Sequence, residues 1–102
     1  MIVYSVKINI QKIVEADWLI WMKNVHIKEV MSTNYFRDWK IFKIIIPESL
    51  DNESGYIIEY ITDSLEKYEA YVKNESRRLQ EDHKKKFGGK FTASRSVMEI
   101  VP

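Results

Sequence analysis

The fold is decided by residues 64–101, which read SLEKYEAYVKNESRRLQEDHKKKFGGKFTASRSVMEIV. From Ser64 to Phe87, side chains suited to burial recur in steps of three and four, the spacing of one face of an α-helix. Charged side chains fill the remaining faces. The pattern predicts an amphipathic helix lying on a flat layer, with these residues on its buried face: Leu65, Tyr68, Val72, Ser76, Leu79, His83 and Phe87.

Both ends of this helix carry termination signals. Asp63 or Ser64 can cap its start, and a run of lysines at 84–86 lies in the last turn, where positive charge suits the helix dipole. Gly88 and Gly89 follow, and glycine reaches the left-handed conformation that ends many helices. The alternating residues 91–101 then predict a strand packed beneath the helix.

The earlier part of the chain supplies another helix and the remaining strands. Residues 2–10 alternate as a half-buried strand, and residues 35–46 and 56–62 are rich in aromatic and β-branched side chains. The polar segment 48–55 predicts a hairpin loop. Residues 15 to about 31 predict a helix whose apolar sector contains Trp18, Leu19, Met22, Val25, His26 and Val30, with Trp21 at its margin and Ile20 and Ile27 outside it.

The resulting order of elements is β-α-β-β-α-β, which is typical of the split-βαβ, ferredoxin-like fold. We therefore expect a single α+β domain over residues 1–102, with a four-stranded antiparallel sheet and two helices on one face. The middle strands carry apolar residues on both sides, so two helices cannot cover all of them. A homodimer that buries one sheet against the other is the simplest cover for the second face.

Composition excludes several classes. The chain has no cysteine and therefore no disulfide or thiolate site, and its alternating N-terminus is unlike a signal peptide. These features favour the cytoplasm, and no apolar run is long enough for a membrane span. The net charge is +1, and Gly55-Tyr56 matches only a fragment of the RNA-recognition motif, so no nucleic-acid partner is expected.

Two motifs resemble a known group. The segments WLIWMK-x-VHI at 18–27 and H-x-x-x-FGGKF at 83–91, together with the predicted topology, resemble a small bacterial family of unknown function within the dimeric α/β barrel superfamily. The resemblance runs over nearly the whole chain and implies the fold and a homodimer. It implies no activity, because relatives in the superfamily include cofactor-independent monooxygenases, haem-degrading monooxygenases, isomerases and stress-response proteins.

The two histidines are the candidate catalytic residues. His83 lies on the buried face of the second helix, where it can act as a base or ligate haem iron, and His26 shares the first helix with Trp21. For each histidine the alternative is a packing role. Asn9, Trp21 and Tyr60 are candidate ligand-binding residues, with Asn9, Trp21 and both histidines expected in one aromatic pocket.

No metal site is expected, because two histidines on different helices have no short spacing to a carboxylate. Haem degradation lacks the tryptophan that the resemblance places on the second helix, where this chain has Tyr68 and Tyr71. The sequence therefore leaves three hypotheses. They are a cofactor-independent monooxygenase or isomerase acting on a small, hydrophobic aromatic or polyketide-like compound, a non-enzymatic stress-response or interaction module, and a haem-binding protein.

Overall fold

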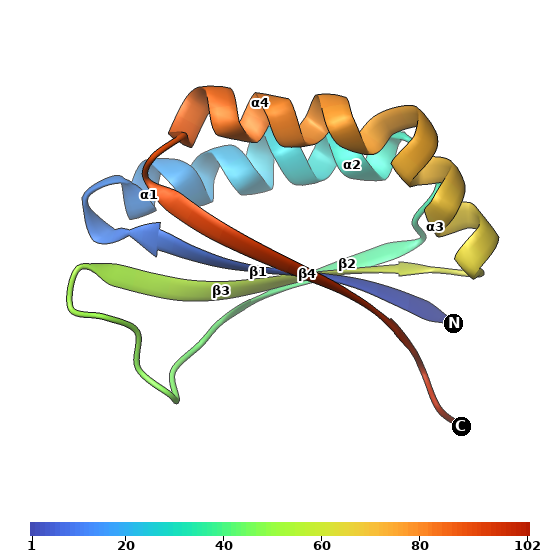
Figure 1. Cartoon of the computed structure of the whole chain (residues 1–102), viewed down its shortest axis with the longest axis horizontal. Coiled ribbons are helices and arrows are strands. Elements are labelled where there is room, and N and C mark those ends of the chain that lie inside the picture. Colours follow the sequence, from blue (N-terminus) through green and yellow to red (C-terminus); the bar gives the residue numbers. More distant parts are fainter.

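A computed structural model describes residues 1–102 and has the predicted architecture. An antiparallel sheet has the strand order β2-β3-β1-β4, and Figure 1 shows both helical runs above one of its faces, with the other face uncovered. The strands are β1 (Ile2–Gln11), β2 (Asp38–Lys43), β3 (Glu53–Thr62) and β4 (Phe91–Glu99), and the helical segments are α1 (Lys12–Trp21), η1 (Met22–His26), α2 (Ile27–Ser32), α3 (Leu65–Tyr71), η2 (Val72–Ser76) and α4 (Arg77–Phe87). The expected ferredoxin-like fold is confirmed.

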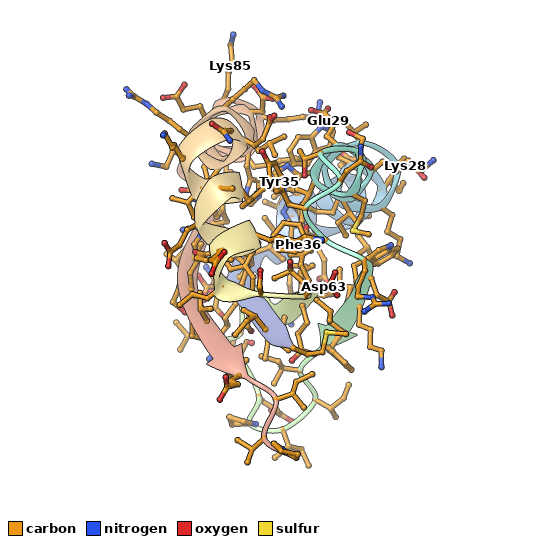
Figure 2. The ribbon with its side chains drawn as sticks, turned by 90° about the vertical axis from the view of Figure 1, so that its right-hand side faces the viewer. Lys28, Glu29, Tyr35, Phe36, Asp63 and Lys85 are labelled. Carbon is orange, nitrogen blue, oxygen red and sulfur yellow. The ribbon has the colours of Figure 1, made fainter.

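The core lies between the sheet and the helices. On β1 the even-numbered residues from Ile2 to Ile10 are buried beneath the helices, and on β3 the register places Tyr56, Ile58 and Tyr60 on the same face. Figure 2 shows Tyr35 and Phe36, from the connection into β2, in the interior, whereas Lys85 points away from the helical layer.

Both helical runs contain a π-helical segment, which the sequence analysis did not anticipate. A π turn inserts one residue and rotates all later side chains relative to a continuous α-helix. In the first run the buried positions therefore step by five from Met22 to Ile27, leaving Val25 exposed. The prediction that Val25 is buried and Ile27 is not was wrong for this reason.

The second run changes phase in the same way. Its buried positions step by five from Tyr71 to Ser76 across η2, then continue through Leu79, His83 and Phe87. Leu65 is 49% exposed and Val72 is 45% exposed, although a strict α-helical stripe placed both on the buried face. The prediction is correct for Leu79, His83 and Phe87, which lie after the π turn in α4, where a single α-helical period holds.

The termini of the elements differ from expectation in part. Ser64 caps α3, with its Oγ accepting a hydrogen bond from the backbone N–H of Lys67 at 3.2 Å. The first helix begins directly after β1, at Lys12 and not at Glu15 as predicted. Its first residues were missed because Lys12 and Ile13 are exposed and follow no pattern of helical burial. The β2 strand covers only 38–43 and not 35–46, since Tyr35 and Phe36 leave the strand and turn into the core.

The open face of the sheet is mixed in character. All four strands contribute to it, and each carries both apolar and polar or charged side chains. The apolar members are Val3, Phe42, Ile57, Ile61 and Met98, and the polar or charged members are Ser5, Lys7, Asn9, Asp38, Lys40, Glu59, Thr92, Ser94 and Ser96. Figure 1 also shows the β2–β3 connection and the C-terminus extending past this face.

Candidate functional site

The candidate site is a cluster of aromatic and imidazole rings between the two helical runs. His83 stacks on Phe91, with ring centroids 3.9 Å apart, and also on Trp21, at 5.6 Å. Trp21 stacks in turn on His26 at 5.1 Å, and the two imidazole centroids are 5.5 Å apart. The fold thus brings together both histidines and Trp21, three of the four residues that were expected in one aromatic pocket.

A buried hydrogen bond fixes the chemical state of His83. The indole N–H of Trp18 donates to Nε2 of His83 over 3.0 Å. An imidazole nitrogen that accepts a hydrogen bond carries no proton, so the proton of neutral His83 lies on Nδ1. Burial, with further contributions from nearby His26 and Arg95, lowers the pKa of His83 to about 3. His83 is therefore neutral at physiological pH.

His26 is also held neutral. Burial lowers the pKa of His26 to about 4, against the opposing charge of Asp82 and with a smaller lowering contribution from Arg95. The His26 ring makes no hydrogen bond to another side chain, and no fully buried polar side-chain atom lacks a partner. Its nitrogens are therefore accessible for a bond to something other than the protein.

A small, partly open cavity lies beside the two histidines, between the helices and the sheet. Its volume is about 20 Å³, enough for about one water molecule. The Tyr60 hydroxyl forms no protein hydrogen bond although the residue is only 2% exposed, so the cavity is where it can find one. The lining combines apolar and polar side chains: Tyr4, Val6, Ile8, Met22, His26, Val30, Ile58, Tyr60, Tyr71, Leu79, Gln80, His83 and Arg95.

Trp21 lies at the boundary between this interior and the outer surface. Besides contacting both histidines, it lines a surface groove of about 410 Å³ with Ile20, Val25 and Phe87, among others. A second groove of about 230 Å³ begins on the same indole. The Trp21 indole is therefore in contact with both the outer grooves and the histidine pair.

Asn9 does not join this site. It alternates with Ile8 and Ile10, whose side chains are buried beneath the helices, so its own side chain is on the open face of the sheet. There its amide oxygen lies close to Gly55, on the neighbouring strand. The prediction of one pocket containing Asn9 and the histidines was therefore wrong, because the sheet separates them.

Two features of the site region were missed. The Trp18 indole was assigned only to the apolar sector, and a donor aimed at a histidine on the other helix has no signal in sequence spacing. The second feature is a carboxylate cluster at the start of α1. Glu15 accepts hydrogen bonds from Ser54 at 2.8 Å and Tyr56 at 2.5 Å, and pairs with Lys43 at 3.2 Å.

The Glu15 cluster satisfies its own polar groups and fastens α1 to β2 and β3. Burial disfavours the charged carboxylate, but the hydrogen bonds from Tyr56, Ser54 and Lys43 outweigh it and lower the pKa of Glu15. Burial and the adjacent Glu15 raise the pKa of Tyr56. Tyr56 also packs on Trp18, with ring centroids 5.0 Å apart, so the cluster supports the tryptophan that holds His83.

The environment of His83 does not fit haem ligation. Its Nε2 is engaged by Trp18, its ring stacks closely on Phe91, and the residue is 3% exposed. A planar macrocycle at this position would have to displace several core rings. No group of three or more metal-ligating side chains is present elsewhere in the chain.

Comparisons with known proteins agree with the fold. An ethyl tert-butyl ether d (EthD) family protein from Bacillus halodurans superposes with a TM-score of 0.67 at 19% identity, over 99% of this chain and 100% of that one. HapK from Hahella chejuensis has a TM-score of 0.70 at 11% identity, over 99% and 93%. A dimeric ferredoxin-like protein from an uncultured marine organism has a TM-score of 0.64 at 14% identity, over 100% and 96%.

These similarities define the class as a ferredoxin-like α+β domain. Residues 1–101 match DUF4286, a domain of unknown function, and the chain belongs to that family. The expected membership of a family of unknown function and the expected ferredoxin-like fold are both confirmed. A comparison with curated proteins finds no match. None of the helices combines the length and apolar character needed to cross a bilayer.

Proposed function

We propose that this protein binds a small organic molecule between its helices and its sheet, next to His26 and His83. The observation that carries the proposal is the small cavity lined by both histidines and by Tyr60. The Tyr60 hydroxyl and the His26 ring make no hydrogen bond within the protein, and neither counts as a fully buried unpaired group, so both can reach a partner from outside the protein. A bound ligand can supply those hydrogen bonds.

The π segments support the same location. Such segments occur frequently at functional sites, because a widened turn moves side chains away from regular positions. Met22 and His26, the first and last residues of η1, both line the cavity. Tyr71, immediately before η2, lines it too.

The present cavity is too small for an organic ligand, so binding requires side-chain movement. Trp21 is the side chain whose displacement connects the histidines to the larger surface grooves. The ligand we propose is a small aromatic or polyketide-like compound, because flat rings would replace the stacking that Trp21 gives up.

If the protein is an enzyme, we propose that it moves a proton at an acidic carbon or hydroxyl without a cofactor. An isomerase needs only this step, whereas a monooxygenase also needs O₂ as the oxidant that reacts with the deprotonated substrate. A base works best when its pKa lies near the working pH. With the pKa of His26 at about 4, its unliganded ring is a weak base. A ligand that brings negative charge next to the ring would raise that pKa toward the useful range.

We further propose that two copies associate through their open sheet faces. The uncovered face carries Phe42, which is 46% exposed, and the adjoining β2–β3 connection carries the still more exposed Ile45 and Ile46. Exposed apolar patches commonly mark interfaces. Two solved proteins of similar fold are described as dimeric ferredoxin-like proteins.

Native mass spectrometry of the protein as purified from cells tests both parts of this proposal. We expect a homodimer that carries a small organic mass, and we expect a Tyr60→Phe variant to lose that mass while remaining dimeric. Lys73→Ala, an exposed change outside the cavity, is the matched control. A dimer that never retains or takes up a small molecule would contradict ligand binding.

The second candidate function is a non-enzymatic dimer that acts as an interaction module. The apolar open face favours it, since that face exists whether or not the cavity is used. Under this alternative both histidines serve packing alone. Replacing His26 with Gln would then alter stability without affecting the binding of any small molecule.

A further inference from the structure

Arg95 is the one strongly basic side chain that lines the cavity. It lies on β4, an edge strand, and its register opposite Val6 places it on the helical side of the sheet. Its Nε donates to the Tyr4 hydroxyl over 3.2 Å. Arg95 is exposed, so its guanidinium is accessible both to solvent and to the cavity that it lines.

No carboxylate pairs with Arg95, although each of the other three arginines in the chain has such a partner. Arg37, Arg77 and Arg78 each form ion pairs with aspartate or glutamate, at 3.6 Å or less. The Arg95 charge acts instead on the neutral groups around the cavity, including Tyr4, Tyr71 and both histidines. The cavity therefore has a positive wall without an internal counter-charge.

An arginine presents several N–H donors in a planar fork that matches an oxyanion. Only one donor of Arg95 is used, and its acceptor is an uncharged tyrosine. We propose that the ligand of this cavity carries an oxyanion, the carboxylate of a small organic acid or the phenolate of an acidic phenol, and that Arg95 is the residue that selects it. This inference rests on the proposed function, because it concerns the same cavity.

The arrangement gives each group a part in recognition. Arg95 binds the negative oxygen, while Tyr60 and the accessible His26 ring bond neutral polar atoms of the ligand. The carboxylate or phenolate replaces Tyr4 as the acceptor of the Arg95 donor, leaving the Tyr4 hydroxyl free to donate to the same oxyanion.

The test uses two matched pairs of probes, benzoate with benzamide and 4-nitrophenolate with 4-nitroanisole. Binding is followed by NMR titration of the Arg95 Nε–H and the histidine ring signals in the full chain. Arg95→Gln removes the charge and keeps an amide donor, and Arg95→Lys keeps the charge without the fork. Arg77→Gln, an arginine on the outer helical surface, is the control for loss of one positive charge.

We expect at least one anion to bind more tightly than its neutral partner, and Arg95→Gln to weaken that anion by about tenfold or more. Arg95→Lys should restore part of the loss, and Arg77→Gln should change nothing. The two pairs distinguish a carboxylate from a phenolate. Equal affinity of an anion for the wild-type protein and Arg95→Gln would overturn the inference.

Failure of the wider proposal has a different signature. Benzamide or 4-nitroanisole could shift the histidine ring signals as strongly as the matching anion does. That result would overturn the role of Arg95 but would still support a ligand site at the histidines. Absence of any shift at these signals with all four probes, up to millimolar concentration, would overturn the oxyanion inference and count against the cavity as a site for small aromatic ligands.

Discussion

At the residue scale, the bond from Trp18 to His83 is the contact on which the site depends. Removing it with Trp18→Phe leaves the buried Nε2 of His83 without a donor, which costs about 1–3 kcal/mol of stability. The neutral imidazole loses a partner, so the pKa of His83 should rise from about 3. A nitrogen-detected NMR titration measures this change.

The matched control is Trp39→Phe, because the Trp39 indole is not among the rings that contact His83. An unchanged titration of His83 in Trp18→Phe would contradict the assigned tautomer.

The two neutral histidines also predict how stability depends on pH. Their pKa values are lowered in the fold, to about 3 and about 4, so the unfolded chain binds more protons below pH 6.5. Stability should therefore fall as pH decreases from 6.5, by up to about 1.4 kcal/mol per pH unit for each histidine. Urea unfolding between pH 7 and about pH 5 measures the slope, because carboxylates titrate mainly below this window.

A His26→Gln/His83→Gln variant provides the control for that slope. It removes both titrating rings, so its stability should be nearly independent of pH in the same window. A wild-type protein that shows no loss of stability on mild acidification would contradict the burial of neutral histidines.

At the element scale, the turn between α4 and β4 uses its two glycines for different reasons. Gly89 has a φ of +79°, a conformation that costs an L-residue roughly 1–2 kcal/mol. Gly88 has an ordinary φ, but an added Cβ would stand 2.4 Å from the Lys84 carbonyl oxygen. Thermal unfolding should show a moderate loss for Gly89→Ala and a larger one for Gly88→Ala. The reverse order would contradict this geometry.

The π segment of the first helical run predicts tolerance to a deletion. Removing the exposed Asn24 changes the step from Met22 to Ile27 from five to four, which a continuous α-helix accommodates with both residues still buried. We expect a folded protein of similar stability with altered Trp21 and His26 ring signals by NMR. Deleting Ala70, which lies in the regular α3, should instead put the flanking halves out of phase and destabilise the fold.

The contrast between prediction and structure is clearest in these helices. The order of elements, the Ser64 cap and the Gly88-Gly89 end were predictable, because each depends on local chemistry. The burial of Ile27 and the exposure of Val72 were not, because a single helical period was applied across a turn that changes it. Asn9 was misassigned although the alternation of β1 already separates it from Ile8, and the error came from treating both sides of the sheet as one pocket.

At the scale of the whole molecule, the uncovered sheet face predicts self-association. Ile57 lies on this face of the central strand β3, opposite Lys7 on β1 and Phe42 on β2. Ile57→Lys should convert a homodimer into a folded monomer by light scattering after size exclusion, because a charge would be buried without a partner. Val72→Lys, an exposed change on the helical surface, should leave the dimer intact. A wild-type monomer at all concentrations would contradict the proposed association.

The indole that donates to His83 also gives the protein a built-in optical reporter. Trp18 is 0% exposed, so its emission should lie at the blue end of the tryptophan range, and its nearest polar neighbour is an imidazole. Trp21, whose ring stacks on both histidines, reports from the outer side of the same cluster. A compound that enters between them should change the emission wavelength and the lifetime of the tryptophan fluorescence. The natural ligand can therefore be sought in unlabelled protein by screening cell extracts for a fluorescence change.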